Sequence, residues 1–195
     1  TVFGWGACGR GVALNVEGAY AEVSVVDSVP LERLQAHLDG FDTPARAAAI
    51  ASADFIVTVT GGGRVLGADD LPLLKDNVIL ANAGHFPAEI DNAAIAGSPE
   101  VASTETYSDG IASLTLRDGR VIHILAEGHM VNLAGPRALG NSIESMDLGF
   151  ALQARCLEAV ALRRVDASSC VVPVPRDIDE RVANAYLDLC YGAAG

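Results

Sequence analysis

The stretch Thr1-Val-Phe-Gly4-Trp-Gly6-Ala-Cys-Gly9-Arg10 decides the fold. It predicts a buried strand that runs through a G-x-G-x-x-G turn into a helix. Gly4 allows a sharp turn, Gly6 removes a Cβ that would block a phosphate, and Gly9 lets the helix pack close to the strand. The helix N-terminus then offers unpaired N–H groups and its positive dipole end to an anion. The pattern predicts a diphosphate cradle, and a plain structural turn is the alternative interpretation.

The next predicted strand, residues 22–26, strengthens this interpretation. It ends in Asp27, about where the dinucleotide fingerprint expects an acidic residue that holds the ribose hydroxyls. A carboxylate at this position favours NAD over NADP, because it repels the 2′-phosphate. The turn and the acid together predict a bound dinucleotide, and we expect the cofactor to be NAD.

The composition of the 195 residues limits the possible classes. Half of them are hydrophobic and 5% are aromatic, which suits an aliphatic core of the kind found in parallel α/β sheets. The net charge of −12 argues against binding to nucleic acid or to an anionic membrane. The four cysteines are scattered without C-x-x-C spacing, which favours reduced thiols in the cytoplasm over disulfides or a metal site.

Strands and helices alternate through the first half of the chain. Two further strands are predicted at 54–60 and 77–81, and they end in Gly61-Gly62-Gly63 and in Asn82–Phe86. Helices are predicted between the strands, at 31–38, 44–51 and 65–74. This order predicts an α/β fold with a Rossmann-type doubly wound parallel sheet, whose ligand lies at the carboxyl ends of the strands.

From residue 100 onward the pattern changes. Short extended pieces are predicted at 101–107, 111–116 and 120–125, with a hairpin turn at Asp118-Gly119, and long helices follow at about 142–163 and 177–189. We expect a Rossmann NAD-binding domain at 1–140 and a C-terminal helical segment at 141–195. The apolar helix that begins at Ser142 needs a partner surface, so we expect either a homo-oligomer or packing on an absent substrate domain. Because only three residues precede the first turn, we expect the chain to be part of a longer enzyme.

Several segments resemble the adenosylhomocysteinase (S-adenosylhomocysteine hydrolase) family. They occur in the family's order and span nearly the whole chain. The most specific is Asn82-Ala-Gly-His-Phe-Pro-Ala-Glu-Ile-Asp91, followed by Leu125-Ala-Glu-Gly-His-Met-Val-Asn-Leu133. The others are Gly4–Gly11, Leu34–Phe41, Ser145–Phe150 and Pro173–Asp179.

The resemblance implies an activity. The family uses tightly held NAD⁺ to oxidise the 3′-hydroxyl of a nucleoside thioether, which acidifies the C4′ proton and lets homocysteine leave. Water then adds and the ketone is reduced again, so S-adenosyl-L-homocysteine is hydrolysed reversibly to adenosine and homocysteine.

The resemblance also implies site residues. His85 would be catalytic, as the imidazole near the reacting ribose. Asn141 would lie on the substrate side, where the family has the histidine of a Gly-His-Pro that is absent here. The cofactor-binding candidates are Gly6, Ala7, Cys8, Gly9, Asp27, Thr58, Thr60, Gly61, Ala83, Gly84 and Asn132.

Each assignment has an alternative. Thr60 and Gly61 could simply end a strand, Asn132 could cap a turn, and His85 could be structural. Ala7 replaces an acidic residue that is common in the family's turn, and Asn141 cannot move protons near neutral pH. The family's substrate-domain carboxylates and lysine lie before its glycine turn. A non-catalytic NAD-binding module that regulates or scaffolds a partner is therefore the second hypothesis, and a 2-hydroxyacid dehydrogenase relative is the third.

Overall fold

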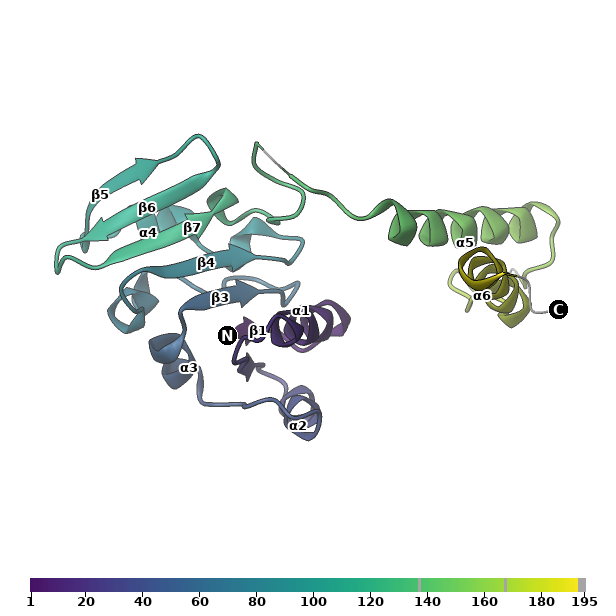
Figure 1. The fold of residues 1–195 in the computed structure, drawn as a ribbon, viewed down its shortest axis with the longest axis horizontal. Helices are drawn as coiled ribbons and strands as arrows, with labels where there is room; N and C mark the ends of the chain where they lie inside the picture. The colour runs from purple at the N-terminus through teal and green to yellow at the C-terminus, as the bar shows by residue number, and fades with distance from the viewer. Residues whose placement is uncertain (137, 167, 193–195) are drawn as a thin grey trace. The chain divides into compact units, whose positions relative to one another are not determined.

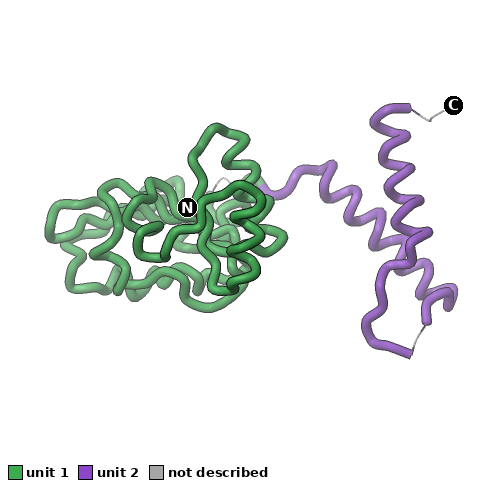
Figure 2. Tube along the Cα trace, turned by 90° about the horizontal axis from the view of Figure 1, so that it is seen from below, with its two compact units in different colours: residues 1–139 green, residues 140–195 purple. Residues whose placement is uncertain are grey.

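The computed structural model describes residues 1–136, 138–166 and 168–192. The chain forms two compact units, residues 1–139 and residues 140–195 (Figure 2). Each unit has its own helices, and all the strands among the described residues belong to the first unit (Figure 1).

Unit 1 is built on a seven-stranded sheet in the order β2-β1-β3-β4-β7-β6-β5. From β2 through β1, β3 and β4 to β7, each strand is parallel to the next. Strand β6 is antiparallel to both of its neighbours, β7 and β5. The strands are β1 (Val2–Phe3), β2 (Val25–Val26), β3 (Phe55–Thr58), β4 (Val78–Asn82), β5 (Val101–Thr106), β6 (Ile111–Leu116) and β7 (Val121–Leu125).

Helices bury both faces of the parallel strands. Successive strand residues point to opposite faces, so Val2 joins a cluster with Ala13 of α1, while Phe3 joins one with Ile50 of α3. This two-sided burial confirms the predicted doubly wound α/β fold. The α-helices of unit 1 are α1 (Ala7–Gly18), α2 (Pro30–Leu38), α3 (Arg46–Ser52) and α4 (Asn92–Ala96). Three 3-10 helices complete it: η1 (Ala68–Leu73), η2 (Pro87–Glu89) and η3 (Ala126–Gly128).

Some predicted boundaries were wrong. The helix expected at 65–74 is the shorter 3-10 helix η1, because Leu66 instead forms an isolated parallel bridge with Ile90. The strand expected at 22–26 is regular only at Val25–Val26. The sequence pattern also gave no indication of α4, whose N-cap Asp91 accepts a hydrogen bond from the Ala94 N–H.

Unit 2 contains the two long helices that the periodicity predicted, α5 (Ile143–Ala161) and α6 (Arg176–Tyr191). Ser142 caps α5, because its Oγ accepts a hydrogen bond from the Ser145 N–H. Large apolar side chains remain exposed on α5, among them Ile143 at 83% and Leu157 at 70%. No helix in the described part of the chain is long and apolar enough to cross a lipid bilayer.

Candidate functional site

The predicted site residues of unit 1 gather at one edge of the sheet. Parallel strands share an orientation, so the segments that follow β1, β2, β3 and β4 all emerge at the carboxyl edge. The glycine turn follows β1, Asp27 follows β2, Thr60 follows β3 and the turn of His85 follows β4.

The fold requires glycine at some positions of the first turn and not at others. A Cβ on Gly9 would lie 2.0 Å from the Gly4 carbonyl oxygen, so only glycine lets α1 approach the strand this closely. A Cβ on Gly6 would meet no atom within 4 Å, and the Gly6 backbone is extended at φ −64° and ψ −178°. The fold therefore does not require glycine at position 6, whereas a phosphate in contact with the backbone would.

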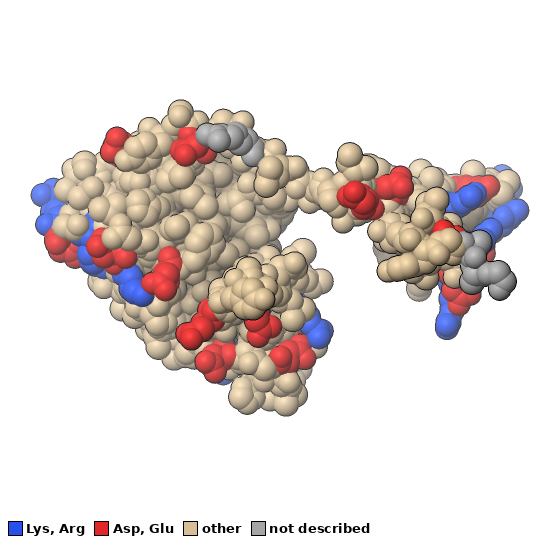
Figure 3. All heavy atoms as spheres, in the orientation of Figure 1, with Lys and Arg blue, Asp and Glu red and all other residues tan. Residues whose placement is uncertain are grey.

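The N-terminus of α1 is open for a ligand. Ala7 and Cys8 form its first turn and are exposed, and no side chain caps the helix within the described residues. The first N–H groups of a helix have no intrahelical partner, so they remain available to an anion. Most charged atoms around α2 are acidic on the face drawn in Figure 3. The unpaired N–H groups and the dipole of α1 would hold a phosphate here.

Asp27 joins the end of β2 to the glycine turn. One carboxylate oxygen accepts the Trp5 N–H at 2.8 Å, and the other accepts the Val29 N–H at 2.8 Å. Each carboxylate oxygen has a second acceptor site, so Asp27 can still receive hydrogen bonds from ribose hydroxyls. The acid and the phosphate cradle are thus held side by side.

Glu89 lies beneath the loop that follows β3. Its side chain is fully buried, and its carboxylate accepts the N–H of Thr60 at 2.8 Å and that of Gly61 at 2.9 Å. The Thr60 hydroxyl donates to the same carboxylate at 3.0 Å. Gly61 takes the left-handed conformation at φ +66°. These contacts fix the backbone of residues 60–61 from below.

Asn82, at the end of β4, is the second buried polar anchor. Its Oδ1 accepts the Gly84 N–H at 2.7 Å and the Thr58 hydroxyl at 3.2 Å. Its amide donates to the carbonyls of Phe86 and Gly128, both at 2.9 Å. Thr58 is itself fully buried, so its side chain supports Asn82 from inside the sheet.

The anchored turn after β4 presents His85. The N–H groups of Ala83 and Gly84 donate to the Thr58 carbonyl at 2.8 and 3.2 Å. A Cβ on Gly84 would lie 2.0 Å from the Glu89 carboxylate, so this position requires glycine. The His85 ring is exposed and lies edge-on to Phe86, with 4.9 Å between the ring centroids. An exposed imidazole on a fixed turn can donate or accept a proton.

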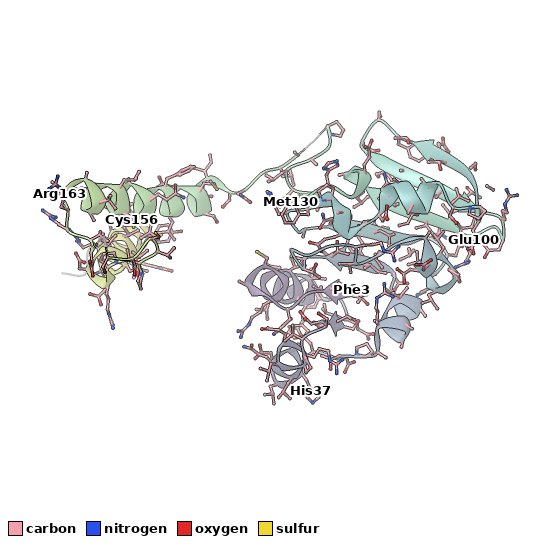
Figure 4. All side chains as sticks on the ribbon, turned by 180° about the vertical axis from the view of Figure 1, so that it is seen from behind. Phe3, His37, Glu100, Met130, Cys156 and Arg163 are labelled. Atoms are coloured by element: carbon pink, nitrogen blue, oxygen red, sulfur yellow. The ribbon has the colours of Figure 1, made fainter. Side chains whose placement is uncertain are left out.

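The two remaining candidates are Asn132 in unit 1 and Asn141 in unit 2. Met130, labelled in Figure 4, forms an isolated parallel bridge with Asn82, and Asn132 follows two residues later as a half-buried residue. Asn141 belongs to unit 2, where it is exposed and its amide lies 3.6 Å from the Met146 sulfur. Within the described part of unit 1, the candidate residues therefore gather around the carboxyl edge of the sheet.

A hollow of about 990 Å³ opens elsewhere in unit 1. Its lining includes Thr1, Ser24 and Phe55 at the amino ends of the strands, and His37 of α2 (Figure 4). None of the glycine-turn residues lines it. Ligands of open α/β sheets bind at the carboxyl ends of the strands, so this hollow is not the cofactor site.

The carboxyl edge fits an adenine dinucleotide. The open space at Gly6, the uncapped N-terminus of α1 and the adjacent Asp27 match the needs of a diphosphate and a ribose. Within the described residues, no group of three His, Cys, Asp or Glu side chains could hold a metal ion. Sequence reasoning missed Glu89 and Asn82 as anchors, although the small residue Gly84 between them was a signal of close packing.

Comparison with known proteins identifies the first unit. Residues 1–138 match the family described as S-adenosyl-L-homocysteine hydrolase, NAD binding domain. The S-inosyl-L-homocysteine hydrolase of Methanothermobacter thermautotrophicus is 39% identical over 96% of this chain and 44% of its own length. The adenosylhomocysteinase of Thermotoga maritima is 38% identical over 96% of this chain and 45% of its own.

The chain thus spans less than half the length of these curated relatives. Among solved structures, a D-2-hydroxyisocaproate dehydrogenase covers 48% of this chain and 28% of its own, with 21% identity and a TM-score of 0.41. A superposition of that extent has no bearing on the family. The match over residues 1–138 shows the family. The chain belongs to the S-adenosyl-L-homocysteine hydrolase family, and its first unit is the NAD-binding domain.

Proposed function

We propose that this chain is the NAD-binding portion of an enzyme that hydrolyses S-adenosyl-L-homocysteine, or a closely related nucleoside thioether, reversibly to the nucleoside and homocysteine. The observation that carries the proposal is the position of His85 on an anchored turn at the same carboxyl edge of the sheet as Gly6 and Asp27. The relatives named as hydrolases of such thioethers support it.

The residues that would hold NAD follow from the strand order. The turn of Gly6, Ala7, Cys8 and Gly9 would receive the diphosphate, and Asp27 on β2 would receive the adenosine ribose. The nicotinamide riboside would then lie on the other side of β1, over the ends of β3 and β4. There it would meet Thr60 and Gly61, Ala83 and Gly84, and Asn132, with Thr58 supporting them from below.

Bound NAD⁺ would supply a transient oxidation of the nucleoside 3′-hydroxyl, which acidifies the C4′ proton and allows homocysteine to leave. His85 would contribute by holding or moving a proton at a ribose hydroxyl, because its ring is exposed and its backbone is fixed. Asn141 would contribute hydrogen bonds on the substrate side without proton transfer.

The nucleobase is left open within this proposal. The relatives include hydrolases named for S-inosyl-L-homocysteine and for S-adenosyl-L-homocysteine at nearly equal identity, 39% and 38%. Both substrates share the ribose and the thioether, on which the reaction takes place. We therefore propose the shared chemistry and treat the base as an outcome of the assay.

We also propose that the protein acts as a cytoplasmic homo-oligomer. Exposed apolar side chains on α5, including Ile143 and Leu157, would be covered in such an assembly. The exposed free thiol Cys8 beside the cofactor turn fits a reducing compartment. Light scattering of the full-length protein would measure the oligomeric state.

The experiment that tests the activity uses the full-length protein loaded with NAD⁺. We would add S-adenosyl-L-homocysteine or S-inosyl-L-homocysteine and measure released homocysteine thiol, and we would follow NADH absorbance after adding adenosine or inosine. Thiol release with at least one substrate is expected, and the variant His85→Ala should lower it by about two orders of magnitude or more.

Bound NAD⁺ without thiol release or NADH formation would contradict the hydrolase proposal. If a partner protein were also to co-purify in that case, the alternative of a non-catalytic NAD-binding module that regulates or scaffolds that partner would be favoured. Calorimetry would then show NAD⁺ binding and no nucleoside binding.

A further inference from the structure

The loop after β3 directs its donors away from the ligand edge. The Thr60 and Gly61 N–H groups donate to the buried Glu89 carboxylate at 2.8 and 2.9 Å. The Gly62 N–H donates to the Thr60 hydroxyl at 3.1 Å, and that hydroxyl donates to Glu89 at 3.0 Å. Three successive backbone donors are therefore engaged, directly or through one hydroxyl, by a single internal anion.

The carbonyl groups of the same loop are left available. Among the described residues, no backbone N–H donates to a carbonyl oxygen of residues 60–63. Positions 61, 62 and 63 are glycine, so they carry no side chain of their own, and all three residues are exposed. The loop thus presents backbone hydrogen-bond acceptors, and residues 61–63 add no side-chain donor of their own.

The two glycine-rich loops of the carboxyl edge therefore have opposite polarity. At Gly6 the uncapped N-terminus of α1 offers donors, which suit a phosphate. At Gly61 the backbone donors of residues 60–62 are engaged by Glu89 or by the Thr60 hydroxyl, whereas the carbonyl oxygens of the loop accept no backbone hydrogen bond among the described residues. From sequence alone, Gly61-Gly62-Gly63 looks equally able to cradle a phosphate.

We propose that Glu89 is a positioning residue that sets this polarity and so determines which half of the cofactor lies over β3. The loop would accept hydrogen bonds from the hydroxyl and amide donors of the nicotinamide riboside and would disfavour a phosphate. The Glu89 carboxylate also packs against the turn of His85, because it occupies the space that a Cβ on Gly84 would need. This inference rests on the proposed placement of NAD along the edge.

The test measures binding rather than turnover. The variant Glu89→Gln keeps the shape of the side chain but replaces one acceptor oxygen with an NH₂ group that faces the loop donors. Its affinities for NAD⁺ and for ADP would be measured by calorimetry, because ADP carries the adenosine and diphosphate without the nicotinamide riboside. The control Asp118→Asn makes the same chemical change at the exposed turn between β6 and β7, at the opposite edge of the sheet.

We expect Glu89→Gln to change the affinity for NAD⁺ and leave the affinity for ADP nearly unchanged. Glu89→Gln should weaken NAD⁺ binding by about tenfold, the loss expected for one charge-assisted hydrogen bond, and should change ADP binding by less than about twofold. Asp118→Asn should change neither. In the ligand-free protein, amide exchange of residues 60–62 should be faster in Glu89→Gln. Equal losses for both ligands, or no loss of NAD⁺ affinity, would overturn the proposal.

A second variant keeps the test decisive if Glu89→Gln does not fold. Thr60→Val leaves Glu89 in place but removes the hydroxyl that joins it to the Gly62 N–H. It should weaken NAD⁺ binding about threefold with ADP unchanged, and Thr60→Ser should restore the wild-type affinity. Because only binding is measured, a protein that binds NAD⁺ but fails to hydrolyse the thioethers would contradict the proposed function alone.

Discussion

Gly6, Gly9 and Gly11 lie within six residues of each other, yet an added methyl group would act differently at each. At Gly9 it would collide with the Gly4 carbonyl at 2.0 Å, whereas at Gly6 and Gly11 it would meet nothing within 4 Å. Gly11 lies inside α1, where alanine favours the helix. Alanine at Gly9 therefore tests packing, alanine at Gly6 tests ligand contact, and alanine at Gly11 tests helix propensity.

We predict three distinct outcomes for alanine at these positions. Gly9→Ala should lower the free energy of unfolding by about 3 kcal/mol through overpacking, whereas Gly11→Ala should raise it by about 0.5–1 kcal/mol. Gly6→Ala should change stability by less than about 0.5 kcal/mol and weaken NAD⁺ binding by about tenfold or more. Urea titration and calorimetry measure both quantities. Unchanged NAD⁺ affinity in Gly6→Ala would show that no phosphate contacts this backbone.

Asp27 combines two tasks, and substitution can separate them. Asp27→Asn keeps an acceptor for one of the two backbone N–H groups but removes the charge. We predict about tenfold weaker binding of NAD⁺ and a smaller preference for NAD⁺ over NADP⁺, because the 2′-phosphate is no longer repelled. Asp39→Asn is the matched control, since Asp39 forms a surface ion pair with Arg10 at 3.1 Å. An unchanged preference in Asp27→Asn, measured by competition between the two cofactors, would contradict this role of Asp27.

At the scale of elements, the sequence correctly predicted the features that depend on residues close together in the chain. The turn after Phe3 and the hairpin at Asp118-Gly119 are determined by residues adjacent in the chain, and both are present. Glu89 and Asn82 were missed for the opposite reason. Their burial depends on backbone donors of other loops, which a single stretch of sequence does not reveal.

The turn between β6 and β7 gives an element-scale prediction for pH. Hydrogen bonds from the Arg120 guanidinium and its backbone N–H hold the pKa of Asp118 below its ordinary value. A depressed folded-state pKa contributes stability above the unfolded value, about 3.9, and that stability is lost as the pH falls through the folded value. Wild type should therefore have a higher urea midpoint than Asp118→Asn at neutral pH. The two midpoints should converge in acid, as the pH falls below the folded-state pKa of Asp118. A difference between the midpoints that stays constant with pH would show that the ion pair is not its source.

At the scale of the whole chain, the two units differ in how much of their apolar surface they bury by themselves. Unit 1 closes its own cores on both faces of the sheet, so its fold followed from strand and helix patterns. Unit 2 leaves large apolar side chains exposed, as at Leu157 and Leu189. The predicted division of labour between a cofactor domain and a C-terminal interface segment therefore needs its own test.

We predict that residues 1–139 alone bind NAD⁺ as tightly as the whole chain does, because the glycine turn, Asp27 and the loops after β3 and β4 all lie within unit 1. At a hundredfold excess over its dissociation constant, NAD⁺ should stabilise unit 1 by about 2.7 kcal/mol. In calorimetric scans of the whole chain, NAD⁺ should raise the transition of unit 1 and leave the unfolding of α5 and α6 unmoved. A tenfold or larger loss of affinity on truncation, about 1.4 kcal/mol, would instead mean that unit 2 supplies cofactor contacts, with Asn141 the first residue to substitute.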